Sequence, residues 1–253
     1  MSATSTSGSK SIDRFYFWAA IVSSLIIFTG FTQTFYLKGL FNTPALSNLL
    51  LVHGLVMTLW FALFITQTRL VAAGRTDLHR RLGAVGAMLV VLIVVVGMAT
   101  TIDAVRRGAT PVPEVTPLMF MAIPFFDVVV FAGLVGVALW FRRRSDIHKR
   151  LMLLATLSIL APGVARIPLD FIKQGGLPMI IVLTLLPVII CAAVDTVRNR
   201  RLHPAFGVGR CICHRFVAIA PDVGGHGSLD AIRNMVCRVN GAGTVGSCKI
   251  TSA

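Results

Sequence analysis

The feature that most constrains this chain is a series of long stretches without Asp, Glu, Lys or Arg, separated by short clusters of charge. Such stretches cover 15–37, 39–68, 82–102 and 174–194, and 115–141 contains only Asp127. A helix of about 20 apolar residues is long enough to cross the hydrocarbon core of a bilayer. Only 13% of the residues are charged, about half the fraction usual in soluble domains. The sequence therefore predicts an integral membrane protein.

A further apolar run, 151–169, is interrupted only by Arg166. The fold class predicted from these runs is an all-α membrane bundle of about six transmembrane helices. Residues 1–13 are polar and predict a disordered cytoplasmic leader, the bundle occupies 14–200, and 201–253 form a cytoplasmic tail without a spanning run. The predicted helices are 14–37, 45–70, 78–102, 116–141, 147–170 and 175–197.

The basic residues are distributed unevenly between the two sides of this bundle. The formal net charge is +14, and the basic residues concentrate on the side of the N-terminus, above all in 69–81, 142–150 and 198–201. Cytoplasmic loops of membrane proteins collect Lys and Arg. The sequence thus predicts a multi-pass protein of a cell inner membrane with both termini in the cytoplasm. The basic loops would attract anionic lipids, and the charge needs no nucleic-acid partner to explain it.

One polar phrase occurs twice, as TDLHRRL at 76–82 and as SDIHKRL at 145–151. Both copies fall at predicted cytoplasmic turns, and the Thr-Asp or Ser-Asp pair that opens each copy is expected to cap the following helix. The internal repeat predicts two parallel hairpins related by an axis along the membrane normal. Their histidines would lie at matching depth. The matched positions are Asp77, His79, Asp146 and His148.

Three ionisable side chains fall inside the predicted spans or near their ends. They are His53, Asp127 and Arg166. An ionisable group costs at least a few kcal/mol in hydrocarbon, so each is a candidate functional residue. We expect the three to converge on one polar site for a ligand or a proton, with Asp127 bridging His53 or Arg166. The alternative is a salt bridge or hydrogen bond that only fixes helix packing.

The runs HGLVMTLWFALFITQTRLVAAGRTDLHRRLG, DIHKRLMLLATLSILAPGVARIP and RLHPA resemble a family of uncharacterised bacterial inner-membrane proteins over roughly residues 14–206. More distantly, the first run is similar to b-type cytochromes of the ascorbate-reducible type, in which histidines on neighbouring helices bind haem. That resemblance implies His53 and His79 as haem ligands. A haem between His79 and His148 would agree better with the predicted depth of these two residues. Apart from this resemblance, the sequence predicts no cofactor.

The likeness to the bacterial family ends after RLHPA, where those relatives continue into another apolar span. After this point the present chain is rich in Gly and Arg instead. We interpret this segment as the product of a shifted reading frame, which replaced the last helix. Cys211, Cys213 and His214 are a weak alternative set of zinc ligands, with Cys237 or Cys248 as a fourth. Their CxC spacing is not the usual CxxC of zinc sites.

Three functions are compatible with the sequence. The first is a polytopic protein that binds a small ligand or relays a proton through His53, Asp127 and Arg166. The second is a membrane electron-transfer protein with haem b, and the third is a structural or assembly protein without a ligand. Because no nucleophile, phosphate loop or zinc-protease helix can be identified, the sequence gives no support for an enzyme.

Overall fold

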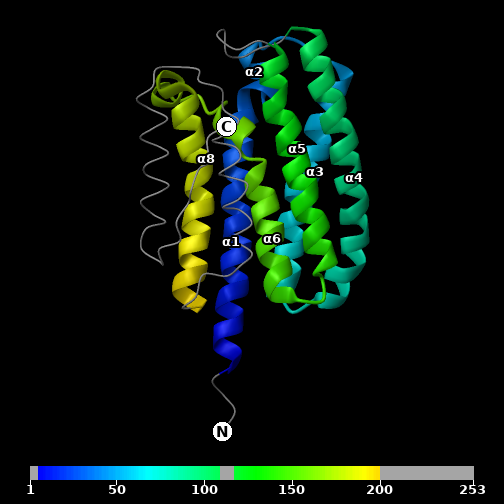
Figure 1. The fold of residues 1–253 in the computed structure, drawn as a ribbon, viewed down its shortest axis with the longest axis vertical. Coiled ribbons are helices and arrows are strands. Elements are labelled where there is room, and N and C mark those ends of the chain that lie inside the picture. The colour runs from blue at the N-terminus through cyan, green and yellow to red at the C-terminus, as the bar shows by residue number, and fades with distance from the viewer. Residues whose placement is uncertain (1–4, 109–116, 200–253) are drawn as a thin grey trace, which may run out of the picture. The chain divides into compact units, whose positions relative to one another are not determined.

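The computed structural model describes residues 5–108 and 117–199, all within one compact unit, Met1–Gly209. These residues form helices and no strand (Figure 1). The predicted tail 201–253, with Cys211, Cys213 and His214, lies outside the described residues. The elements are α1 Ser5–Phe31, the π-helix η1 Thr32–Tyr36, α2 Lys38–Phe41, α3 Asn48–Ala72, α4 Thr76–Arg106, α5 Pro117–Trp140, α6 Ser145–Ser158, α7 Ala161–Val164 and α8 Asp170–Asn199.

The predicted fold class is confirmed. Six segments of the described chain are long and apolar enough to cross a membrane, so the protein is an all-α, multi-pass membrane protein. The first helix starts earlier than predicted, because α1 begins at Ser5 within the expected leader. The six spanning segments are Arg14–Tyr36, Asn48–Ala72, Thr76–Arg106, Ala122–Trp140, Ser145–Val164 and Pro178–Val197.

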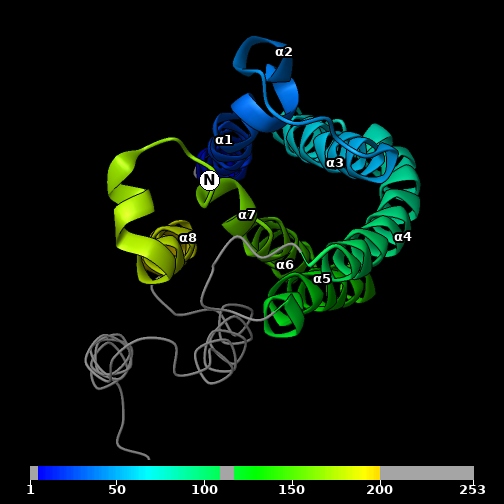
Figure 2. The ribbon, with the colours of Figure 1, turned by 90° about the horizontal axis from the view of Figure 1, so that it is seen from above.

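The helices α3, α4, α5 and α6 contact one another in chain order, and α1 contacts both α3 and α6 and so closes a ring (Figure 2). α8 lies outside this ring against α6 and α7. The α3–α4 and α5–α6 turns, which carry the repeated phrase, lie at the same end of the bundle (Figure 1). We call this the turn end, and the opposite end, where α3 begins and α4 finishes, the loop end.

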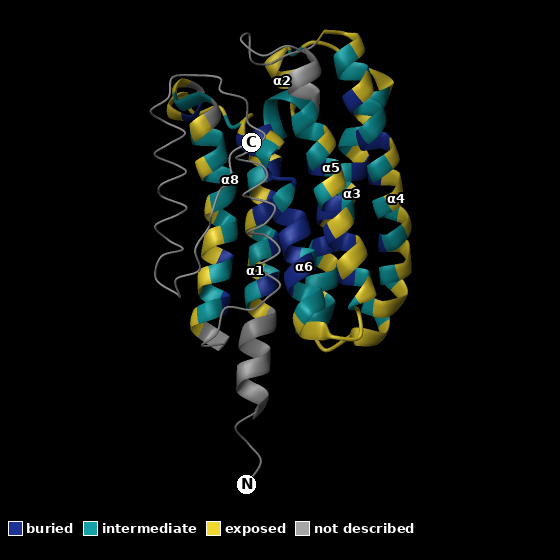
Figure 3. Ribbon diagram, in the orientation of Figure 1, coloured by how far each residue is buried: buried dark blue, intermediate teal, exposed yellow. Residues whose placement is uncertain are grey.

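The fifth span differs most from its prediction. It ends at Val164 rather than near 170, and it consists of α6 and the short α7. The backbone of α7 lies against α1, where a methyl group added to Gly30 would be 2.0 Å from the carbonyl oxygen of Gly163. Only glycine permits this approach. The span is also the most deeply enclosed, and its core residues include Leu153 and Leu157 (Figure 3).

The predicted N-caps of the repeated phrase are wrong by one residue. The helices begin at Thr76 and Ser145, so the N-cap positions are held by Arg75 and Arg144, and neither has a side-chain capping hydrogen bond. The carbonyl oxygens of Arg75 and Arg144 accept the first helical hydrogen bonds, from the N–H groups of His79 and His148, so Thr76 and Ser145 lie inside the first turn. The acidic residue that follows also lies in the first turn, where the helix dipole favours negative charge.

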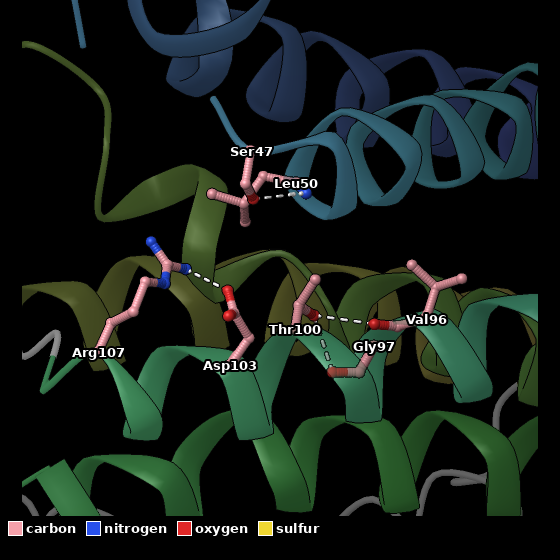
Figure 4. Close-up of polar contacts among 7 residues, drawn as sticks. All are labelled: Ser47, Leu50, Val96, Gly97, Thr100, Asp103 and Arg107. Carbon is pink, nitrogen blue, oxygen red and sulfur yellow. Dashed lines mark hydrogen bonds and ion pairs between the residues drawn. The ribbon is translucent and has the colours of Figure 1, made fainter. Parts of the chain in front are cut away.

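At the loop end, polar side chains find partners close by in the chain (Figure 4). Ser47 caps α3 by accepting a hydrogen bond from the backbone N–H of Leu50 at 3.3 Å. Arg107 forms an ion pair with Asp103 at 2.6 Å, one turn back on α4. The Thr100 hydroxyl donates to carbonyl oxygens of its own helix at 2.8 and 3.0 Å. Such local bonds keep polar groups paired near hydrocarbon.

Candidate functional site

The predicted cluster of His53, Asp127 and Arg166 forms only in part. His53 on α3 is half-buried and lies close enough to Arg166 to interact electrostatically. The Arg166 guanidinium donates to the Pro162 carbonyl oxygen at 3.0 Å and lies 4.9 Å from the centre of the Phe31 ring. Arg166, an exposed residue, therefore contacts α7 and α1 near the loop end, and its link to His53 on α3 is electrostatic only.

Asp127 does not bridge to either of these residues, so that part of the prediction is wrong. The Phe131 ring meets Trp60, and Asp127 precedes Phe131 by four residues whereas His53 precedes Trp60 by seven, so Asp127 lies about 4.5 Å nearer the turn end than His53. Asp127 is 9% exposed and opens the buried stripe of α5 that continues through Phe131, Val135 and Ala138. It makes no hydrogen bond or ion pair with any residue that the structure describes.

An aromatic cluster separates Asp127 from the turn end. The indole of Trp60 stacks on Phe64 with ring centres 6.5 Å apart and meets Phe131 edge-to-face at 4.9 Å. Trp60 is 2% exposed and its Nε1–H has no partner among the described residues. The bundle interior thus holds a polar N–H in this cluster and a carboxyl group one helical turn before Phe131.

The repeated histidines meet at the turn end. The rings of His79 on α4 and His148 on α6 have centres 6.4 Å apart and planes at 77°. His148 Nδ1 pairs with the carbonyl oxygen of Ala138 at 2.8 Å, and Gln67 donates its Nε2–H to the carbonyl oxygen of His79 at 3.3 Å. The expected matching depth is therefore observed. Because His53 lies near the loop end, His53 and His79 cannot share one haem iron.

A buried ion pair was missed by the sequence analysis. Arg150, in the second copy of the repeated phrase, was expected at the lipid phosphates, but it is 4% exposed and its Nε lies 2.9 Å from Oδ2 of Asp195 on α8. Tyr16 and Cys191 lie near the pair. An acid directly after the apolar run 174–194 was the signal that could have predicted it.

Comparison of the chain with protein-family models, curated proteins and solved structures finds no match. Within the described residues, no group of three or more His, Cys, Asp or Glu side chains is arranged to hold a metal ion. A metal ion or metal cofactor at the His79–His148 pair would need further ligands other than His, Cys, Asp or Glu side chains.

Proposed function

We propose that this protein relays protons through the interior of the α3–α6 bundle, with Asp127 as the proton-carrying group. The observation that carries the proposal is that Asp127 is 9% exposed, faces inward and has no partner among the described residues. A carboxylate left unpaired in a membrane interior is costly, and such groups mark proton and ion pathways. A group that alternates between its neutral and charged forms is suited to this role.

Polar groups on either side of Asp127 support the proposal. His53 and Arg166 lie toward the loop end, and the Trp60 Nε1–H lies toward the turn end. Buried polar atoms without protein partners are commonly satisfied by ordered water. Water between these groups would connect Asp127 to the loop end, and the aromatic cluster of Trp60, Phe64 and Phe131 would restrict passage toward the turn end.

The orientation follows from charge. Figure 1 shows that α1 begins, and α8 finishes, at the turn end, where Arg75, Arg80, Arg142 and Arg143 are exposed. The positive-inside rule assigns that end to the cytoplasm, so that both termini are cytoplasmic. We place the protein in a bacterial inner membrane, with the repeated phrases marking two related hairpins, α3–α4 and α5–α6, and with anionic lipids at the basic turns.

The test is proton flux into proteoliposomes that contain a trapped pH-sensitive dye, driven by a potassium diffusion potential. Asp127→Asn keeps the shape of the side chain but cannot carry a proton, and should reduce the flux to that of empty vesicles. Asp103→Asn is the matched control, because Asp103 is half-exposed and paired at the end of α4. It should leave the flux unchanged.

The same flux in the Asp127→Asn protein and the wild type would refute the proposal. Each variant must elute from size exclusion in detergent as the wild type does. If Asp127→Asn aggregates while Asp127→Glu is folded and conducts, the carboxyl group itself is required. If Asp127→Glu is folded and does not conduct, the relay is refuted and the structural alternative is favoured.

A further inference from the structure

We propose that His79 and His148, together with Gln67, form a binding site for one divalent transition-metal ion at the turn end of the bundle. The site is separate from Asp127 and does not depend on the proton relay. It combines one residue each from α3, α4 and α6, and two of them come from the repeated phrase.

The spacing of the two imidazole rings fits one shared metal ion. A metal–nitrogen bond is about 2.0–2.1 Å, and about 1.1 Å separates that nitrogen from the ring centre. Two imidazoles on one ion would therefore have ring centres about 5 Å apart in a tetrahedral arrangement and about 6.3 Å apart on opposite sides. The observed distance is 6.4 Å. This distance matches two imidazoles on opposite sides of one ion, and a tetrahedral arrangement would need the ring centres to approach by about 1.4 Å.

The hydrogen bond of His148 prepares its ring for coordination. When Nδ1–H donates to the Ala138 carbonyl oxygen at 2.8 Å, the proton is held on Nδ1 and the lone pair of Nε2 is left free. Histidines that bind metals usually donate their other N–H to a carbonyl or carboxylate in this way, which fixes both tautomer and orientation.

The other two ligands are buried and lack partners. Nδ1 of His79 and Oε1 of Gln67 are both inaccessible to solvent and make no hydrogen bond with the described residues. The amide of Gln67 is held in place, because its Nε2–H donates to the carbonyl oxygen of His79 at 3.3 Å. When the ring proton of His79 is on Nε2, both Nδ1 of His79 and Oε1 of Gln67 have lone pairs that a cation would bind.

The ligand chemistry selects the class of ion. Imidazole nitrogen suits Zn²⁺, Cu²⁺, Ni²⁺ and Co²⁺, whereas Ca²⁺ and Mg²⁺ prefer all-oxygen sites. Two histidines and one amide oxygen leave the remaining coordination positions to water that would enter with the ion. Asp77 and Asp146 precede the two histidines by two residues each, in the first turns of α4 and α6, and Asp77 pairs with Arg75 at 3.7 Å.

The experiment is titration of the full-length, metal-free protein in detergent with Co²⁺ and Cu²⁺, followed by visible absorption and by the nitrogen splitting of the Cu²⁺ resonance. The cysteines of the tail, which could also bind these ions, are replaced by Ser in every sample. These are Cys211, Cys213, Cys237 and Cys248. The expected result is one ion per chain with signals of two coordinated nitrogens.

Replacing either histidine should weaken binding at least tenfold and remove one nitrogen signal. His148→Asn can still donate to the Ala138 carbonyl oxygen, so it separates loss of the ligand from loss of the fold. His53→Ala and His214→Ala are the controls and should bind as before. Gln67→Leu should weaken binding several-fold with both nitrogen signals retained.

Binding that survives both His79→Ala and His148→Asn would overturn the proposal. So would a Soret band in the protein as purified that either substitution abolishes, because the pair would then bind haem iron rather than a free ion. Neither result bears on Asp127, whose role is decided by proton flux.

Discussion

The buried ion pair between Arg150 and Asp195 provides a sharp test of the packing, because the repeat supplies its own control. Arg81 holds the same position in the first copy of the phrase as Arg150 holds in the second. Arg81 is exposed, whereas the Arg150 and Asp195 side chains are each 5% exposed with a 2.9 Å contact. Equivalent residues therefore have opposite environments, and the same substitution should have very different effects.

Removing one partner of a buried pair leaves the other charge uncompensated and costs about 3–5 kcal/mol. Arg150→Gln and Asp195→Asn should each lower the free energy of unfolding by about that amount. Arg81→Gln changes an exposed side chain and should remain within about 0.5 kcal/mol of wild type. Arg150→Gln combined with Asp195→Asn removes both charges together and should cost less than the sum of the two single losses.

Equilibrium unfolding in mixed detergent micelles, monitored by tryptophan fluorescence, gives the four free energies and the coupling between the two positions. A similar loss for Arg81→Gln and Arg150→Gln would refute the argument, because burial would then not distinguish the copies. Additive losses in the double variant would show that the two charges do not stabilise each other.

Two pairs of substitutions test the close packing and the aromatic cluster. Gly30→Ala places a methyl group 2.0 Å from the Gly163 carbonyl oxygen and should destabilise the protein by about 1–3 kcal/mol in thermal unfolding; Gly133→Ala on α5 meets nothing within 4 Å and should be neutral or stabilising. Phe131→Ala removes one wall of the aromatic cluster and should raise proton flux in proteoliposomes, whereas Phe61→Ala, also fully buried, should lower stability without raising flux. Equal flux in these two phenylalanine variants would exclude the cluster as a barrier.

The spans could be predicted from the sequence because each segment that crosses hydrocarbon must be long and apolar, whatever its neighbours are. The contacts between the spans could not be predicted in this way. The inward direction of Asp127 depends on which face of α5 meets Trp60, and the burial of Arg150 depends on α8 lying against α6. The matching depth of His79 and His148 in the membrane could be predicted because the two copies of the repeat have nearly the same sequence. The break after Ser158 was not predicted, although Pro162 and Gly163 were visible signals.

The position of Asp195 also affects how the protein is made. Arg150 emerges from the ribosome 45 residues before its counter-ion, and its span is the least hydrophobic of the six. During synthesis the fifth segment therefore lacks the carboxylate that neutralises Arg150. We expect this segment to remain beside the translocon or near the lipid headgroups until α8 has been synthesised. A nascent chain halted before Asp195 should leave the fifth segment extractable by alkaline carbonate, and release of the last helix should complete integration.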